Sequence, residues 1–328
     1  MESGGEIPVL VVFGPTASGK TDLAEALFAS DQSDSAKNPF RGRVDIVSAD
    51  SMQVYRGMDI GTAKPDPSLL ERLPHLLIDI RSPREQFGAG DFVRLADEAC
   101  RSSWASARFP VLLGGTAFYL KNFVYGLPDT PEADPATREA LRARLSREGP
   151  LPLRAELERV DPESARRIHP SDEYRLLRAL EVYAASGRPL SSFSLSGSPR
   201  AGYRFFVAAL ERPRDELYAR IDRRVDLMFE RGLREEFARL WEEGYRADDP
   251  GMQAIGYREF FEAASEEGRD PPNADGERVR FLIKRDSRRY AKRQYTFFRS
   301  LPGVVWFFAD DRDGFLAAVK AFYGAVAT

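Results

Sequence analysis

A phosphate-binding loop is the first candidate for chemistry in this sequence. Residues 14–21 read GPTASGKT and fit the pattern G-x-x-x-x-G-K-[ST], between an apolar run at 7–13 and a helical pattern at 21–27. Backbone N–H groups at a helix N-terminus form an anion cradle, Lys20 adds a positive charge, and the Thr21 hydroxyl is placed to bind Mg²⁺. We therefore predict a diphosphate or triphosphate ligand, whose identity the pattern leaves open. The predicted contacts are Gly14, Thr16, Ala17, Ser18, Gly19, Lys20 and Thr21.

Polar residues follow two further predicted strands. Asp50 comes after the strand expected at 44–47, and Thr116 comes after the strand expected at 111–113 and a pair of glycines at 114–115. The carboxyl ends of parallel strands line one crevice, so we expect both residues beside the phosphate loop. Asp50 has three possible roles: to hold Mg²⁺, to accept a proton from a nucleophile, or to cap a helix. The glycines are expected to let the backbone approach a ligand closely.

Two arginines lie four residues apart on the helix predicted after Pro213. Arg220 and Arg224 share a face that is different from the apolar face of this helix. Arginine is suited to clamping a phosphate as charge develops on it, although arginines on a solvated helix face are common.

A basic segment lies near the end of the sequence. Nine basic residues occur between Arg278 and Arg299, and in the sequence only Asp286 opposes them. Aromatic residues are interleaved with them, and basic stripes with aromatics suit an RNA backbone with unstacked bases. The pattern leaves two interpretations open, an RNA-binding helix and a solvated charged helix.

The composition excludes several classes of protein. The 328 residues are 43% hydrophobic with a formal charge of −3, and no run of about 18 apolar residues could span a membrane. Residues 1–8 lack the pattern of a signal peptide. The single Cys100 excludes an internal disulfide, and two histidines leave little for a zinc site. We expect a cytoplasmic protein that has no contact with membranes and is a monomer.

Strands and helices alternate through the first part of the chain. Short apolar runs predict buried strands at 7–13, 44–47, 76–78, 111–113, 205–210 and 304–308, with a helix at 91–107 and a polar loop at 30–42. After about residue 126 the pattern is helical, with caps at Asp134, Asp161 and Ser171-Asp172. The fold class predicted is α/β, with a P-loop NTPase-like parallel sheet core (1–125 and 201–328), a helical insertion domain (126–200) and a basic helical C-terminal region.

Several segments together resemble the bacterial tRNA dimethylallyltransferase family. They occur in the family order as GPTASGKT (14–21), SADSMQVYRGMDIGTAKP (48–65), PHLLIDI (74–80), GGTAFYL (114–120), HPSDEYRLLRALEVY (169–183), RIDRRVDLM (220–228), MQAIGYRE (252–259) and AKRQYTFFR (291–299). The similarity covers nearly the whole chain, and the string at 55–65 is especially specific.

The resemblance implies a reaction. The phosphate loop would hold dimethylallyl diphosphate rather than ATP, and N6 of adenosine 37, next to the tRNA anticodon, would attack C1 of the prenyl group with loss of pyrophosphate. Asp50 would be the general base, Thr21 and Thr116 would help to hold Mg²⁺, and Lys20 and Arg224 would stabilise the departing diphosphate. Thr116, Asp50, Arg224 and Lys20 are thus the expected catalytic residues.

The resemblance also implies contacts with the anticodon stem-loop of tRNAs that carry A36-A37-A38. The target base must leave its stack to reach a buried diphosphate, and the insertion domain would clasp the stem. Phe297 departs from the family, which usually has tryptophan there. The expected tRNA contacts are Asp50, Ser51, Met52, Gln53, Thr116, Arg138, Tyr174, Arg175, Leu176, Leu177, Arg178, Gln253, Ala254, Ile255, Gly256, Tyr257, Arg258, Lys292, Arg293, Gln294, Tyr295, Thr296, Phe297, Phe298 and Arg299.

Three other functions use some of the same features. An ATP-dependent small-molecule kinase would need a phosphoryl acceptor pocket. An adenylate isopentenyltransferase would have little use for the basic C-terminal helix. A non-enzymatic RNA-binding protein with a relic phosphate loop would not need the expected catalytic residues.

Overall fold

The computed structural model describes residues 5–30, 38–131, 134–193 and 197–324. The chain divides into a unit formed by Met1–Val124 with Pro199–Thr328 and a unit formed by Tyr125–Ser198. Most of the polar loop expected at 30–42, namely residues 31–37, lies outside the described residues. Residues 1–4 of the N-terminal segment also lie outside them.

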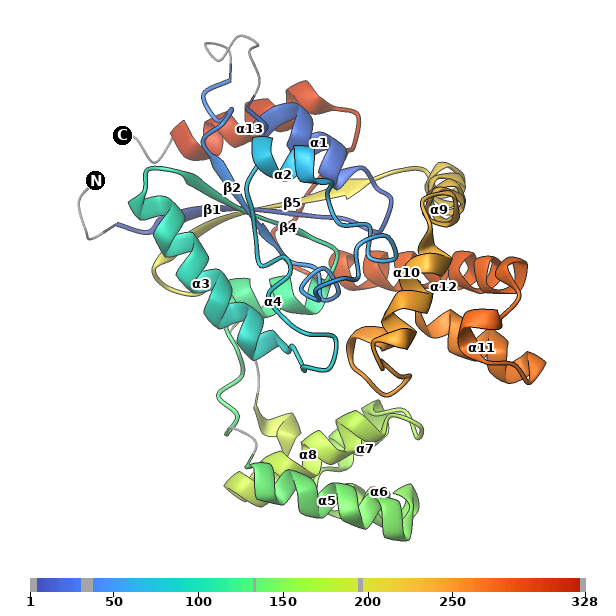
Figure 1. Cartoon of the computed structure of the whole chain (residues 1–328). Helices are drawn as coiled ribbons and strands as arrows, with labels where there is room; N and C mark the ends of the chain where they lie inside the picture. The colour runs from blue at the N-terminus through green and yellow to red at the C-terminus, as the bar shows by residue number, and fades with distance from the viewer. Residues whose placement is uncertain (1–4, 31–37, 132–133, 194–196, 325–328) are drawn as a thin grey trace. The chain divides into compact units, whose positions relative to one another are not determined.

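The first unit is built on one six-stranded parallel sheet, which confirms the predicted fold class (Figure 1). The strand order is β3-β2-β4-β1-β5-β6. All pairs run parallel, and β1 lies between β4 and β5. The strands are β1 (Ile7–Phe13), β2 (Val44–Ser48), β3 (His75–Leu76), β4 (Phe109–Gly114), β5 (Tyr203–Glu211) and β6 (Val305–Phe308).

The strand expected at 76–78 is shorter and begins one residue earlier, at His75. Leu77 and Asp79 have positive φ angles of 65° and 57°, which are incompatible with an extended strand. The prediction from the apolar run was therefore wrong about its length. The other five strands lie where they were expected, most with extensions of one or two residues.

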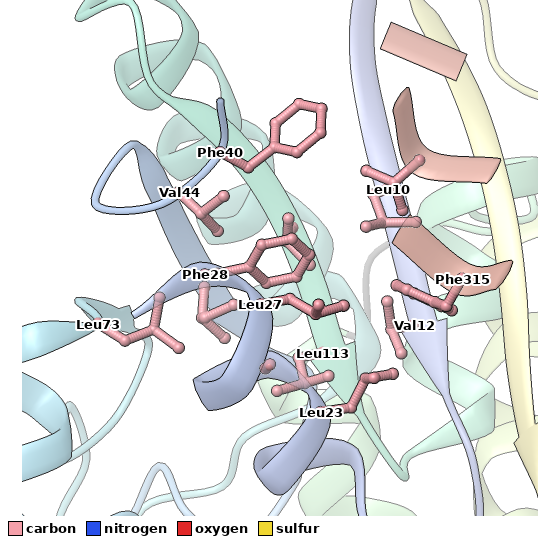
Figure 2. Packing of buried hydrophobic residues seen from close by; sticks show 14 of the residues in the cluster. Leu10, Val12, Leu23, Leu27, Phe28, Phe40, Val44, Leu73, Leu113 and Phe315 are labelled. Carbon is pink, nitrogen blue, oxygen red and sulfur yellow. The ribbon is translucent and has the colours of Figure 1, made fainter. Parts of the chain in front are cut away.

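Helices cover both faces of the sheet. The helices of this unit are α1 (Lys20–Phe28), α2 (Pro67–Arg72), α3 (Ala89–Ala105), α4 (Ala117–Tyr125), α9 (Arg214–Glu230), α10 (Leu233–Glu242), α11 (Arg258–Glu267), α12 (Gly276–Arg299) and α13 (Arg312–Gly324). On one face, Leu23 and Phe28 of α1 and Phe315 of α13 pack against Leu10 and Val12 of β1 (Figure 2). Figure 1 shows α3 on the opposite face. Short 3₁₀ turns cover Gly251–Gln253 and Pro271–Asn273 in this unit and Leu190–Ser192 in the second unit.

The second unit is a small helical cluster. It contains α5 (Pro135–Glu148), α6 (Pro150–Val160), α7 (Pro162–Arg167) and α8 (Glu173–Ser186). The side chains of Asp134, Asp161 and Asp172 accept backbone N–H bonds at the starts of α5, α7 and α8, so these three caps are confirmed. Leu153 and Leu157 of α6 are fully buried in its core.

Candidate functional site

The phosphate loop joins β1 to α1 through a tight backbone. Ala17 and Gly19 have positive φ angles of 61° and 99°, which turn successive N–H groups toward one side. A Cβ atom on Gly14 would lie 2.7 Å from the Ser18 Oγ and 3.1 Å from the Leu210 carbonyl oxygen. Only glycine fits at position 14, and the loop has the shape of an anion cradle.

The Lys20 ammonium lies inside this loop. Its Nζ donates to the carbonyl oxygens of Gly14 and Pro15, each at 2.9 Å. Burial, together with the charge of Arg224, lowers the pKa of Lys20 to about 7, and Asp50 acts in the opposite direction. A bound anion would restore the full positive charge, because it would stabilise the protonated form.

Arginines near the loop differ in their contacts. Arg212 Nε donates to the Ser18 carbonyl at 2.8 Å, and Arg220 Nε donates to the Ala17 carbonyl at 2.9 Å. Both therefore hold the backbone of the loop. Among the described residues, the Arg224 guanidinium has no hydrogen bond, although its pKa is lowered by burial and raised by the charge of Asp50. Arg224 is therefore available to a ligand.

Asp50 begins a turn rather than a helix, so the helix-capping role that the sequence left open is wrong. Its Oδ1 accepts N–H bonds from Met52 at 2.9 Å and from Gln53 at 3.4 Å, as in an Asx turn. Its charge also acts on Lys20 and Arg224, so the carboxylate faces the phosphate loop. The turn fixes the orientation of a carboxylate that lies in the site, and its roles toward Mg²⁺ and as a base stay predictions.

The two glycines before Thr116 allow close approaches within the protein. A Cβ on Gly114 would lie 2.2 Å from the Ala49 carbonyl oxygen, and a Cβ on Gly115 would lie 2.6 Å from the Gln294 Nε2. Both glycines also line the cavity that contains Lys20 and Thr21, so a close approach of a ligand to them stays a prediction.

Thr116 connects the ends of β2 and β4. Its Oγ1 accepts the Ser51 N–H at 3.0 Å and lies 3.3 Å from the Ser51 Oγ, and its own N–H donates to the Ala49 carbonyl at 3.1 Å. These bonds fix the turn that carries Asp50.

Two residues of α12 complete the site. Gln294, which is only 4% exposed, accepts the Thr16 N–H at 3.0 Å and donates to the Gly115 carbonyl at 2.7 Å. Tyr290 lies one turn earlier, and burial together with Asp50 raises its pKa to about 12. The sequence analysis did not propose Tyr290 as a site residue. Its i, i+4 spacing from Gln294 was the available signal.

Two adjoining pockets share the side chains of Thr16, Asp50, Arg224 and Tyr290. The first, which we name the α9 pocket, has a volume of about 260 Å³. The second, which we name the loop pocket, has a volume of about 100 Å³. The α9 pocket also contains the apolar side chains of Ile221, Val225, Met228, Ile255 and Ile283. The loop pocket also contains Lys20, Thr21, Ser48, Gly115 and Gln294. An anion suits the loop pocket, and an apolar group attached to it would extend into the α9 pocket.

Oxygen donors in the loop pocket fit the chemistry of Mg²⁺. Thr21, Ser48 and Asp50 line it, and Mg²⁺ is bound through few protein oxygens together with phosphates and water. Thr116 lines neither pocket, and its hydroxyl accepts the Ser51 N–H. Among the described residues there is no cluster of three or more His, Cys, Asp or Glu side chains with the geometry of a metal site. His75 also lines the loop pocket, and its Nδ1 lies 2.7 Å from the Leu73 carbonyl oxygen.

A buried carboxylate organises the loop that follows Met58. Glu236 on α10 is 7% exposed and accepts the N–H groups of Asp59, Ile60 and Gly61 at 2.9–3.1 Å. It also accepts the Tyr257 hydroxyl at 2.6 Å. The sequence analysis missed Glu236, since nothing local distinguishes it from the other acidic residues of its helix. The hydrogen bonds to Glu236 explain why the segment around 55–65 has a fixed shape beside the pockets.

Part of the expected tRNA-contact set is buried. Tyr257 and Phe298 are fully buried and Leu176 is nearly so, and these side chains pack in cores. The resemblance implies contacts for whole segments, and some residues of each segment face inward. The other buried members are Leu177, Ala254, Gly256 and Gln294. In the second unit Arg138 and Arg178 both pair with the buried Glu181, at 2.9 Å and 3.4 Å, while Tyr174 is 74% exposed.

The basic helix α12 is partly neutralised by acidic residues from other helices. Asp222 on α9 pairs with Arg288 at 2.9 Å, and Asp226 pairs with Lys284 at 2.7 Å. Glu262 and Glu266 of α11 pair with Arg285 and Arg278. Asp286 is the only acidic residue between Arg278 and Arg299 in the sequence. In the folded chain, acidic residues of α9 and α11 also pair with this helix, so the expectation that only Asp286 opposes its charge is wrong.

The end of α12 keeps its positive charge. Within the described ranges, Lys292, Arg293 and Arg299 have no ion pair, and the latter two guanidinium groups lie 5.8 Å from the rings of Tyr290 and Tyr295. Arg293 also lines the α9 pocket. The net positive surface of α12 is therefore its last two turns.

Comparison with known proteins identifies the family. The IPP transferase family model matches residues 53–301. The tRNA dimethylallyltransferase 1 of Trichlorobacter lovleyi is 44% identical over 299 residues, which are 91% of this chain and 92% of the relative. The tRNA dimethylallyltransferase of Geobacter sulfurreducens is 39% identical over 309 residues, 93% of each chain. A crystal structure of the tRNA isopentenylpyrophosphate transferase from Bacillus halodurans matches with a TM-score of 0.66 and 36% identity, over 98% of this chain and 96% of that one. The chain therefore belongs to the IPP transferase family, in which its relatives are tRNA dimethylallyltransferases.

Proposed function

We propose that this enzyme transfers a dimethylallyl group from dimethylallyl diphosphate to N6 of adenosine 37 in tRNAs that carry A36-A37-A38. The observation that carries the proposal is the pair of adjoining pockets that meet at Asp50 and Arg224. A diphosphate in the loop pocket would place its prenyl group against the apolar side chains of the α9 pocket. The names of the relatives agree with this reaction.

The chemistry is one alkyl transfer. The lone pair of the adenine N6 forms a bond to C1 of the prenyl group, and the C1–O bond breaks with its electron pair going to the diphosphate. The proton from N6 goes to the Asp50 carboxylate, which acts as general base. Lys20, the loop N–H groups and Arg224 stabilise the charge that develops on the departing pyrophosphate. Mg²⁺, proposed at Thr21, would neutralise further charge on the diphosphate. Thr116 as a second Mg²⁺ ligand stays a prediction.

The RNA substrate would be held by the last two turns of α12. Lys292, Arg293 and Arg299 would contact phosphates, and the aromatic side chains between them offer stacking surfaces to unstacked bases. The adenosine would be extruded from the anticodon loop to reach the pockets. The insertion domain, with the exposed Tyr174, would contact the anticodon stem.

The setting proposed is a monomer in the cytoplasm. No helix within the described ranges has the length and apolar character needed to cross a membrane.

The test is transfer of labelled prenyl from dimethylallyl diphosphate, with Mg²⁺, to three acceptors. These are an anticodon stem-loop with A36-A37-A38, the same RNA with A37 changed to G, and free AMP. Label only in the first RNA would support the reaction and the position. Label in AMP would favour an adenylate isopentenyltransferase, and ATP hydrolysis without transfer would favour a kinase.

A further inference from the structure

The α9 pocket borders a third cavity. This side cavity, of about 340 Å³, lies between α9 and residues 59–79. Its lining combines apolar side chains with charged ones: Ile60, Pro65, Leu70 and Leu227 are apolar, and Asp59, Lys64, Asp66, Asp79 and Arg231 are charged. Only Arg224 and Met228 line both the side cavity and the α9 pocket. These two side chains therefore form the wall between the two spaces.

The two parts of the wall differ in chemistry. Arg224 lies beside Asp50 and the loop pocket, where the proposed reaction needs its charge. Met228 is 7% exposed and belongs to the buried apolar stripe of α9 with Val225 and Ile221. Its thioether side chain is long and unbranched, so it fills a gap between spaces that a shorter residue would leave connected.

We propose that Met228 sets the length of the prenyl group that the enzyme accepts. The α9 pocket must hold the transferred group together with the reacting edge of the adenine, and Met228 lines this pocket where it borders the side cavity. A ten-carbon chain would need the apolar lining of the side cavity beyond that wall. The inference rests on the proposed function and adds a specificity-determining residue to it.

The reaction of a longer donor is the same step. With geranyl diphosphate, N6 would form its bond to C1 of the geranyl group, the C1–O electron pair would leave with pyrophosphate, and the N6 proton would go to Asp50. Only the chain beyond the reacting carbons changes. The effect of Met228 is therefore expected in the choice of donor rather than in the chemistry.

The experiment compares dimethylallyl and geranyl diphosphate as donors to the A36-A37-A38 stem-loop. For Met228→Ala and Met228→Val, the ratio of kcat/KM for geranyl over dimethylallyl should rise by about 10- to 200-fold, the range for pocket-size discrimination. Leu227→Ala is the matched control, because Leu227 lines the side cavity but not the α9 pocket. Its ratio should stay at the wild-type value.

Both kcat/KM values are measured on one preparation, so a lower concentration of folded enzyme affects them equally and leaves their ratio unchanged. Met228→Val also preserves more of the core packing than Met228→Ala. An unchanged ratio in both Met228 variants, with dimethylallyl transfer retained, would overturn the role of Met228. An equal rise in Leu227→Ala would also overturn it. If the wild-type enzyme transfers no dimethylallyl group to the stem-loop, the proposed function is refuted instead.

Discussion

Replacing Glu236 by alanine should destabilise the protein and damage its activity together. The carboxylate accepts three backbone N–H groups of Asp59, Ile60 and Gly61 and the Tyr257 hydroxyl in a place that water barely reaches. Each buried donor left without a partner costs about 1–3 kcal/mol. Because the structure around the missing carboxylate can relax in part, the total cost is smaller than the sum over the four donors. We therefore expect a loss of about 3–5 kcal/mol in the free energy of unfolding, as for other broken buried networks.

The free energy of unfolding is measured by urea denaturation, with transfer activity assayed on the same samples. Glu235→Ala is the matched control, because Glu235 is the exposed neighbour on the same helix and should change stability by less than about 0.5 kcal/mol. Tyr257→Phe removes only one donor and should cost about 1 kcal/mol. If Glu236→Ala costs no more than Glu235→Ala, the carboxylate does not organise the loop and the reasoning is refuted.

Three further predictions concern the reaction and its substrates. Asp50→Ala should lower kcat by about 100- to 10,000-fold, the usual contribution of a general base, while calorimetry should show that dimethylallyl diphosphate still binds. If the variant loses diphosphate binding but keeps its kcat, Asp50 is not the general base. Because the Lys20 pKa is about 7 without ligand and a bound anion raises it, diphosphate affinity should fall as the pH rises above 7, with proton uptake on binding. A pH-independent affinity between pH 6 and 9 contradicts this. Lys292→Ala and Arg299→Ala should each reduce the slope of log K against log salt for tRNA binding by about 1, whereas Arg288→Ala should change it little because Asp222 already pairs with Arg288.

Features that depend on neighbouring residues in the chain could be predicted from the sequence. The phosphate loop, the strands before Asp50 and Thr116, and the caps at Asp134 and Asp161 each follow from a short pattern of residue types. The side chains of Lys20 and Asp50 meet as expected because parallel strands end at one edge of the sheet, and Arg224 reaches the same pocket from α9.

Features that depend on distant partners could not. Gly114 and Gly115 are explained by Ala49 and Gln294, which no local pattern connects to them. The charge of α12 is set by Asp222 and the other acidic residues of neighbouring helices. Glu236 and Met228 have ordinary residue types at ordinary helical positions, and only the folded arrangement shows what they touch.

The bond between Gln294 and the phosphate loop has a consequence for how the enzyme is made. Thr16 is synthesised early, but Gln294, whose side chain accepts the hydrogen bond from the Thr16 N–H, is synthesised 278 residues later. A nascent chain that stops before α12 carries the complete loop motif with the Thr16 N–H and the Gly115 carbonyl still without their partner. Activity should therefore appear only after nearly the whole chain has been synthesised, so truncated translation products would not release a partly active transferase.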